Sequence, residues 1–315
     1  MKLSICIPTF NRSKMVINQL LFIQNEFFGF ENEIEIIVSD NCSNSLSKSE
    51  LVKFSQGNTF FKLFLQEKNL GLIGNTEFLL TKSKSEYVWF VGDDDELEKG
   101  ISKKIFEIFN KYNCLSYIFF NHNCFKNNIL NVVDSFDLKK YSGYTKKGTE
   151  IMFDILNKYG TINMFMTANI YNRELLITKN KVLNRSLVIE DFLWFSFISS
   201  ASGPIYIVSE VYVHDNYGGS SWSNSARKIF GIDIPNRLIE FDEFIHTNVD
   251  IRRVLFKYYI KGRGNFIYMI LFASNIERAS IVGFLGIKKS MVLIFRAFFL
   301  SLVRLFISIF KKHRI

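Results

Sequence analysis

Short segments that are mainly apolar alternate with segments of helical period along the first hundred residues, and this pattern constrains the fold more than any other feature. The apolar segments are residues 3–7, 34–38, 60–65 and 87–91. A strand that is apolar on both faces must be covered on both, which is typical of a parallel sheet between two layers of helices. We therefore predict an α/β fold with a Rossmann-like, mainly parallel central sheet.

The later part of the chain contains fewer such segments. Residues 116–120 and 205–213 are two further expected strands, and a helix is expected to begin within 188–194. From Ile229 the pattern is helical, so we expect a first domain over 1–225 and a helical C-terminal region over 226–315. A length of 315 residues fits two domains of roughly 150 residues each.

Cysteine usage and the first residues indicate a compartment. The four cysteines form no CxxC pair and no Cys/His cluster with zinc spacing, which favours reduced thiols in the cytoplasm. The apolar stretch before Pro8 is shorter than the roughly 7–15 residues of a signal peptide core. We expect the catalytic part to remain in the cytoplasm.

Polar side chains follow the expected strands, where parallel sheets bind their ligands. Asn11 follows the first strand, Asp40 ends the second, and Asp93, Asp94 and Asp95 follow the fourth. We expect these side chains to converge on one site although they are distant in sequence.

The three consecutive carboxylates admit two interpretations. At the end of a buried strand they repel one another, and a hard cation such as Mg²⁺ or Mn²⁺ relieves that repulsion and bridges to a diphosphate. Alternatively, they form a solvated acidic turn that caps a helix starting near Glu96.

Other candidates also have a structural alternative. Asp40 accepts hydrogen bonds from a base or ribose, or it caps a turn. Residues 69–75 contain glycines before an expected helix over 75–83, and their amides suit a phosphate, but they lack GxGxxG. Phe10 stacks on a base or belongs to the core.

Two later candidates remain open in the same way. Glu190 and Asp191 either supply a general base for an acceptor hydroxyl or are ordinary acids in the first turn of a helix. His214 binds a metal or a diphosphate, or it is a loop histidine.

The order and spacing of four blocks over roughly residues 1–100 resemble the family 2 glycosyltransferases. The blocks are SICIPTFNR at 4–12, IVSDNCS at 37–43, NLG with Asn75 at 69–75, and WFVGDDDEL at 89–97. Within that family the chain looks most like bacterial enzymes of O-antigen or capsule synthesis, including the abequosyltransferase-like branch. The resemblance implies a GT-A fold, a nucleotide-sugar donor, Mn²⁺ or Mg²⁺, and inverting transfer. A UDP-sugar is the first expectation, with CDP-, dTDP- and GDP-sugars as alternatives.

The resemblance also implies roles for individual residues. The donor-binding set it implies is Pro8, Phe10, Arg12, Asp40, Asn69, Gly71, Asn75, Asp93 and Asp94. The metal ligands it implies are Asp94, Asp95 and His214, and the implied base is Asp191. Gly92 stands where the family usually has its first aspartate, and this departure puts the role of Asp93 in doubt.

The sequence of the C-terminal segment predicts a membrane-associating helix over about 287–312. Residues 291–310 are long enough to span a bilayer, but Arg296 and Arg304 interrupt them. Each arginine costs roughly 2.5–3.5 kcal/mol at the centre of a spanning helix. A helix in the plane of the interface avoids this cost, and its cations gain about 1 kcal/mol each from anionic lipids. The alternatives are a spanning helix and a helix packed on the first domain or on a second copy.

We therefore expect a peripheral enzyme on the cytoplasmic face of the inner membrane, with a lipid-linked saccharide acceptor and anionic lipids as partners. A homodimer is also compatible with the sequence. The alternative function is a degenerate GT-A module that binds nucleotide-sugar or saccharide without turnover. The net charge of +9 suggests nucleic acid as a third class, but no basic–aromatic recognition motif is present, so we expect no nucleic-acid partner.

Overall fold

The computed structural model describes residues 1–125, 136–180, 187–216, 225–245, 248–262 and 265–296. The chain divides into two compact units. Unit 1 comprises Met1–Met152 and Thr161–Gly219, and unit 2 comprises Phe153–Gly160 and Ser220–Ile315. Helix α5 (Gly148–Tyr159) contributes to both units. The boundary at 219/220 lies six residues before the expected one, and unit 2 also takes 153–160.

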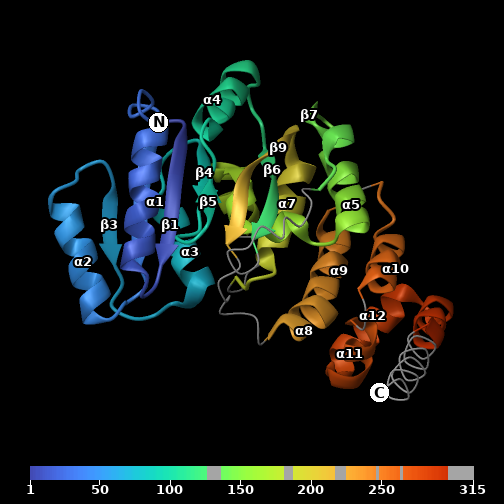
Figure 1. The fold of residues 1–315 in the computed structure, drawn as a ribbon. Helices are drawn as coiled ribbons and strands as arrows, with labels where there is room; N and C mark the ends of the chain where they lie inside the picture. Colours follow the sequence, from blue (N-terminus) through green and yellow to red (C-terminus); the bar gives the residue numbers. More distant parts are fainter. Residues whose placement is uncertain (126–135, 181–186, 217–224, 246–247, 263–264, 297–315) are drawn as a thin grey trace, which may run out of the picture. The chain divides into compact units, whose positions relative to one another are not determined.

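Unit 1 is built on a mixed sheet (Figure 1). In spatial order its strands are β3 (Lys62–Leu65), β2 (Ile34–Asp40), β1 (Leu3–Thr9), β4 (Tyr87–Phe90), β8 (Asn169–Asn172), β6 (Tyr117–Phe125), β9 (Ile205–Asn216) and β5 (Glu96–Leu97), with β7 (Gly143–Thr145) paired to β9. The first four strands are parallel, as the sequence predicts. Strand β8 runs antiparallel to both β4 and β6, whereas β6 and β9 are parallel.

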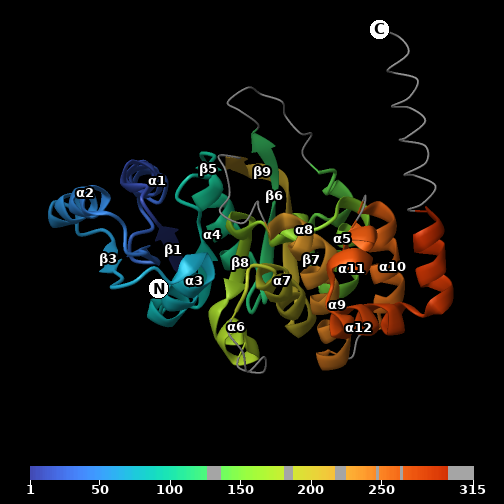
Figure 2. The ribbon, with the colours of Figure 1, turned by 90° about the horizontal axis from the view of Figure 1, so that it is seen from below.

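Helices cover both faces of the parallel part. Every residue of β1 and of β2 is buried, which explains why these strands are mainly apolar before their last residues. Figure 2 shows α1 (Ser13–Glu26) and α3 (Gly71–Lys82) on opposite sides of β1. The side chains of Ile5 and Ile7 belong to one apolar cluster with α1 and with α4 (Ile101–Lys111). The remaining helices of unit 1 are α2 (Ser45–Gln56), α6 (Arg173–Asn180) and α7 (Asp191–Ser202).

Unit 2 is helical in its described residues, as expected from Ile229 onward. Its helices are α8 (Ala226–Lys228), α9 (Ile234–Phe244), α10 (Ile251–Lys261), α11 (Asn265–Phe272) and α12 (Asn275–Leu285), followed by a helical stretch over 287–296. The hydroxyls of Tyr258 and Tyr259 on α10 donate to the carbonyls of Phe230 and Gly231, 2.7 and 2.9 Å away. A capping box between Ser274 and Glu277 starts α12. The rest of the predicted helix, 297–312, lies outside the described residues.

Three local expectations are wrong. The helix expected near Glu96 is the short strand β5, which pairs with β9, and α4 starts only at Ile101. The helix expected from Asn75 begins at Gly71, so the glycine-containing loop is shorter than predicted. His214 lies within β9 and not in a loop. In each case a partner distant in sequence or a tight turn overrides the local pattern.

Candidate functional site

The ends of β1 and β2 meet the segment after β4 at one edge of the sheet. Thr9 and Asp40 are paired across the two parallel strands, so both strands end at the same level. The hydroxyl of Thr9 donates to Asp93 Oδ2 at 2.6 Å, and both side chains are buried. The strand ends therefore bring together residues that are far apart in sequence, as predicted.

Arg12 joins the start of α1 to the acidic segment. Its Nη1 lies 3.0 Å from Asp93 Oδ1 and 2.6 Å from Asp94 Oδ2. Burial raises the pKa of Asp93 to about 6, although Thr9 and Arg12 favour its charged form. One guanidinium thus balances two carboxylates, with Asp94 the more exposed of the two.

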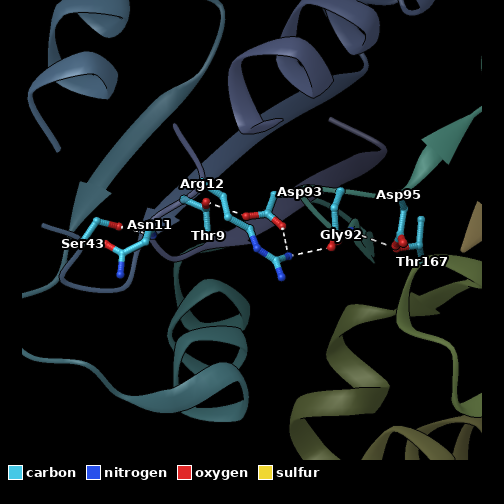
Figure 3. A network of polar contacts seen from close by, with 9 residues as sticks. Thr9, Asn11, Arg12, Ser43, Gly92, Asp93, Asp95 and Thr167 are labelled. Atoms are coloured by element: carbon cyan, nitrogen blue, oxygen red, sulfur yellow. Dashed lines mark hydrogen bonds and ion pairs between the residues drawn. The ribbon is translucent and has the colours of Figure 1, made fainter. Parts of the chain in front are cut away.

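Asp95 points away from Arg12 and is held by Thr167, on the 3₁₀ turn η3 (Met166–Ala168) (Figure 3). The Thr167 hydroxyl donates to Asp95 Oδ2 and accepts the amide of Gly92 at 2.8 Å. Burial raises the pKa of Asp95 well above its usual value, and the charges of Asp93 and Asp94 add to this effect. The acidic segment is therefore packed into the protein and is not the solvated turn of the alternative interpretation.

Asp40 is linked to the same network through Ser43. Its fully buried carboxylate accepts hydrogen bonds from the amide and the hydroxyl of Ser43. The Ser43 hydroxyl in turn accepts the amide of Asn11 at 2.7 Å, and Asn11 adopts a left-handed conformation with φ of 57° next to Arg12. Figure 3 shows this chain of contacts from Ser43 to Thr167. The structure thus connects five of the predicted site residues: Asp40, Arg12, Asp93, Asp94 and Asp95.

The remaining predicted donor residues lie around this network. Phe10 is 41% exposed directly after β1, whereas Pro8 is buried within β1. Asn69 and Gly71 are fixed by Asn41, whose amide nitrogen donates to Asn69 Oδ1 at 3.0 Å and to the Gly71 carbonyl at 3.1 Å. Gly71, with φ of +71°, takes a conformation that other residues rarely adopt.

Asn75 lies behind the strand ends, on the buried face of α3. Its Oδ1 accepts the Ser39 hydroxyl at 2.6 Å and its Nδ2 donates to the Ser39 carbonyl at 2.9 Å. Only 1% of Asn75 is exposed, so the contact that the structure gives it is with the sheet. Its predicted contact with a donor stays a prediction.

Asp191 is the first residue of α7, and its carboxylate is buried. Its Oδ2 accepts the amide of Val188 at 2.7 Å. Burial and the nearby charge of Asp191 raise the pKa of Glu77 on α3. Asp191 therefore lies within electrostatic range of α3, the helix that follows the segment Asn69–Leu70. Its role as base stays a prediction.

His214 is placed next to the acidic segment by the pairing of β9 with β5, opposite Glu96. Its Nδ1 contacts Asn123 Oδ1, and its Nε2 lies 2.7 Å from Glu98 Oε1. Both ring nitrogens have partners, so metal binding would require His214 to exchange one of them.

The carboxylate oxygens of the acidic segment are ligands of the kind that a hard divalent cation prefers. Within the described residues, no three His, Cys, Asp or Glu side chains are grouped as a metal site. Mg²⁺, however, is commonly held by one or two carboxylates together with substrate phosphates. Asp94 and Asp95 supply two such carboxylates, and a cation would favour the charged form of Asp95, which burial disfavours.

Several residues of this network were not singled out from the sequence. Thr9, Asn41 and Ser43 lie inside the quoted sequence blocks, so their neighbourhood was the available signal. Nothing in the sequence pointed to Glu77 or Thr167 as site residues, because Glu77 lies in an ordinary helix and Thr167 lies in a stretch without hydrophobic periodicity. Only the fold brings Thr167 to Asp95.

Comparison with protein families and with known sequences gives the following matches. The sequence model of the family described as Glycosyl transferase family 2 matches residues 4–176. The GalNAc(5)-diNAcBac-PP-undecaprenol beta-1,3-glucosyltransferase of Campylobacter jejuni is 38% identical over 100 residues, which is 31% of each chain. Abequosyltransferase RfbV of Salmonella typhimurium is 34% identical over 101 residues, 31% of this chain and 30% of RfbV. The matched stretches thus span about a third of these relatives.

Solved structures share the fold over most of the chain. S. aureus TarS 1–349, in complex with UDP-GlcNAc, superimposes with a TM-score of 0.63 at 18% identity, covering 91% of this chain and 80% of TarS 1–349. The mannosyltransferase PcManGT from Pyrobaculum calidifontis, in complex with GDP-Man and Mn²⁺, gives 0.54 at 10% identity, covering 94% and 79%. At these identities the likeness concerns the fold alone, which is GT-A in architecture with a helical C-terminal region.

Proposed function

Because this chain belongs to glycosyl transferase family 2, we propose that it transfers a sugar with inversion from a nucleotide-sugar to a saccharide acceptor. The observation that carries the proposal is the network from Asp40 through Ser43 and Asn11 to Arg12, which contacts the acidic segment. It places a buried carboxylate suited to a ribose or base beside carboxylates suited to a cation and a diphosphate. The two curated relatives are named for sugar transfer in bacteria, one of them to a lipid-linked saccharide, which supports the same class of acceptor.

In this proposal the residues divide the chemistry as follows. Asp40 and Phe10 hold the nucleoside, and Arg12 adds a fixed positive charge near the diphosphate. Asp94 and Asp95 would hold a Mg²⁺ or Mn²⁺ ion, which would neutralise charge on the leaving diphosphate. Asp191 takes the proton of the acceptor hydroxyl while the hydroxyl oxygen attacks the anomeric carbon of the donor sugar. The bond between the anomeric carbon and the diphosphate oxygen breaks at the same time. Positioning and electrostatics then supply most of the rate enhancement.

A donor screen tests this assignment. We expect one class among UDP-, CDP-, dTDP- and GDP-sugars to raise the melting temperature of the full chain with Mn²⁺, and less so with a chelator, since a ligand of the folded state stabilises it. A UDP-sugar is the first candidate. The same donor should be hydrolysed slowly in water and transferred faster to an acceptor. Stabilisation without any turnover would instead support a binding module, and no response to any donor would contradict both functions.

We also propose that unit 2 attaches the enzyme peripherally to the inner leaflet of the cytoplasmic membrane. Residues 220–315 carry sixteen Lys and Arg against six Asp and Glu, whereas residues 1–219 carry 23 against 24. Within 287–296, Ile287, Met291 and Phe295 recur every four residues and are exposed, while Leu293 is buried. An outward apolar stripe in a cationic region suits an anionic lipid surface. Among the described residues, no helix combines the length and the hydropathy needed to cross a bilayer.

Vesicle flotation tests the attachment. The double variant Ile287→Ser/Phe295→Ser should lose binding to phosphatidylglycerol vesicles, as should truncation after residue 286. Phe28→Ser, which removes an even more exposed ring from unit 1, is the control and should float normally. If the stripe joins two copies, the double variant will change a dimer to a monomer in light scattering while flotation stays unchanged. That result would contradict membrane attachment through this stripe.

A further inference from the structure

We propose that Thr167 is a positioning residue of the site: its hydroxyl fixes the Asp95 carboxylate in the space that the absent side chain of Gly92 leaves open. The inference deepens the proposed function, because it concerns a carboxylate assigned there to the cation. It accounts for the one departure of the acidic segment from the family pattern. It also connects the segment to a turn more than seventy residues away in sequence.

The hydrogen bonds of the Thr167 hydroxyl have a defined direction. The amide of Gly92 can only donate, and it lies 2.8 Å from Thr167 Oγ1, so the hydroxyl oxygen accepts there. A hydroxyl carries a single hydrogen, which is then directed to Asp95 Oδ2. Thr167 is fully buried, so no solvent competes for either bond. The Asp95 oxygen that faces Thr167 is consequently held as an acceptor.

The turn that carries Thr167 is itself fixed to the strand before the acidic segment. The indole Nε1 of Trp89, on β4, donates to the Thr167 carbonyl at 2.8 Å. Both ends of Thr167, its carbonyl and its hydroxyl, therefore contact the same stretch of chain between Trp89 and Asp95. Because Trp89 is completely buried, the turn cannot move without disturbing the core of unit 1.

Gly92 is required here for space. A Cβ atom at this position would lie 2.3 Å from Asp95 Oδ2 and 2.8 Å from Asp95 Cγ, closer than real Cβ atoms approach. The carboxylate cannot easily withdraw, because Thr167 holds it from the other side. Gly92 and Asp95 are therefore a matched pair: the side chain missing at 92 leaves the volume that the carboxylate of 95 fills.

A double-mutant cycle tests the packing without any assumption about activity. Gly92→Ala should lower the melting temperature of the full chain by several degrees. In an Asp95→Ala background the same substitution should cost less than half as much, because the clashing carboxylate is gone. Equal losses in both backgrounds would overturn the matched pair.

Matched substitutions at Thr167 test the positioning role. Thr167→Val removes the hydroxyl at nearly constant volume, and Thr167→Ser keeps it. With UDP and Mn²⁺ as probes, we expect Thr167→Val to bind Mn²⁺ at least tenfold more weakly, measured by the electron paramagnetic resonance of free Mn²⁺, and Thr167→Ser to stay within threefold of wild type. With the donor found in the screen, Thr167→Val should lower kcat more than it raises KM.

The outcomes separate the two proposals. Wild-type behaviour of Thr167→Val, or equal losses in Thr167→Ser and Thr167→Val, would overturn the role of Thr167. A wild-type protein that neither binds nor turns over any donor would contradict the proposed function, while the melting-temperature cycle would still decide whether Asp95 occupies the space at Gly92.

Discussion

Replacing Asn75 by alanine separates two roles that the sequence left undivided, direct donor binding and support of the sheet. In the structure, the amide of Asn75 makes two hydrogen bonds to Ser39, at 2.6 and 2.9 Å, and both residues are buried. Ser39 immediately precedes Asp40 on β2. We therefore expect Asn75→Ala to act on the site indirectly, by loosening the end of the strand that carries Asp40.

The size of the effect follows from these contacts. A typical hydrogen bond contributes about 1 kcal/mol, and a buried polar group left without its partner costs about 1–3 kcal/mol. Gln66 still donates to the Ser39 hydroxyl oxygen at 3.0 Å after the substitution, which limits the loss. We expect a destabilisation of about 2–3 kcal/mol, or about 4–12 °C in melting temperature for a unit of this size.

Differential scanning calorimetry of the full chain measures this change. Asn69→Ala is the control, because Asn69 is exposed and its loss should shift the melting temperature by less than about 2 °C. In a Ser39→Ala background, Asn75→Ala should cost clearly less, since the shared bonds are already gone. An unchanged melting temperature together with lost donor binding would refute the reasoning and assign Asn75 to the donor.

Three further substitutions test individual carboxylates. Asp93→Asn should stabilise the protein in chelator at pH 7 by about 2–3 kcal/mol, because the folded state raises the pKa of Asp93 to about 6. The wild type loses this stability as the pH rises from about 4 to 6, so the two proteins should have the same melting temperature near pH 4. A difference in stability that does not depend on pH would contradict this origin. Asp94→Ala should abolish transfer while circular dichroism stays native, and retained turnover would exclude Asp94 as an essential ligand. Asp191→Ala should lower kcat by about 10²–10⁴-fold with donor affinity retained, as expected for loss of a general base, and full activity would show that another group takes the proton.

The positions of the buried strands and of the polar residues after them were predictable from sequence. A strand covered on both faces is mainly apolar, and this shows in consecutive residues such as Ile5–Ile7 of β1 and Ile36–Val38 of β2. The parallel arrangement then places Asp40 and the segment 93–95 at one edge, without any knowledge of distant contacts. The family was recognisable for the same reason, because its blocks are local.

The tertiary structure decided what depends on distant partners. Strand β5 has two residues and no distinctive pattern, and it exists because β9 pairs with it; that pairing also moves His214 out of a loop. The antiparallel strand β8 comes from a region without visible period and is fixed by its neighbours β4 and β6.

The sequence by itself determined the parallel strands of unit 1 and the edge of the sheet at which the carboxylates gather, because burial on both faces leaves a continuous run of mainly apolar residues in a strand. Only the tertiary structure decided that Arg12 balances Asp93 and Asp94, and that Thr167 holds Asp95 over Gly92. Hydrogen bonds and close packing of this kind join single residues across long stretches of chain, and no spacing along the sequence records them.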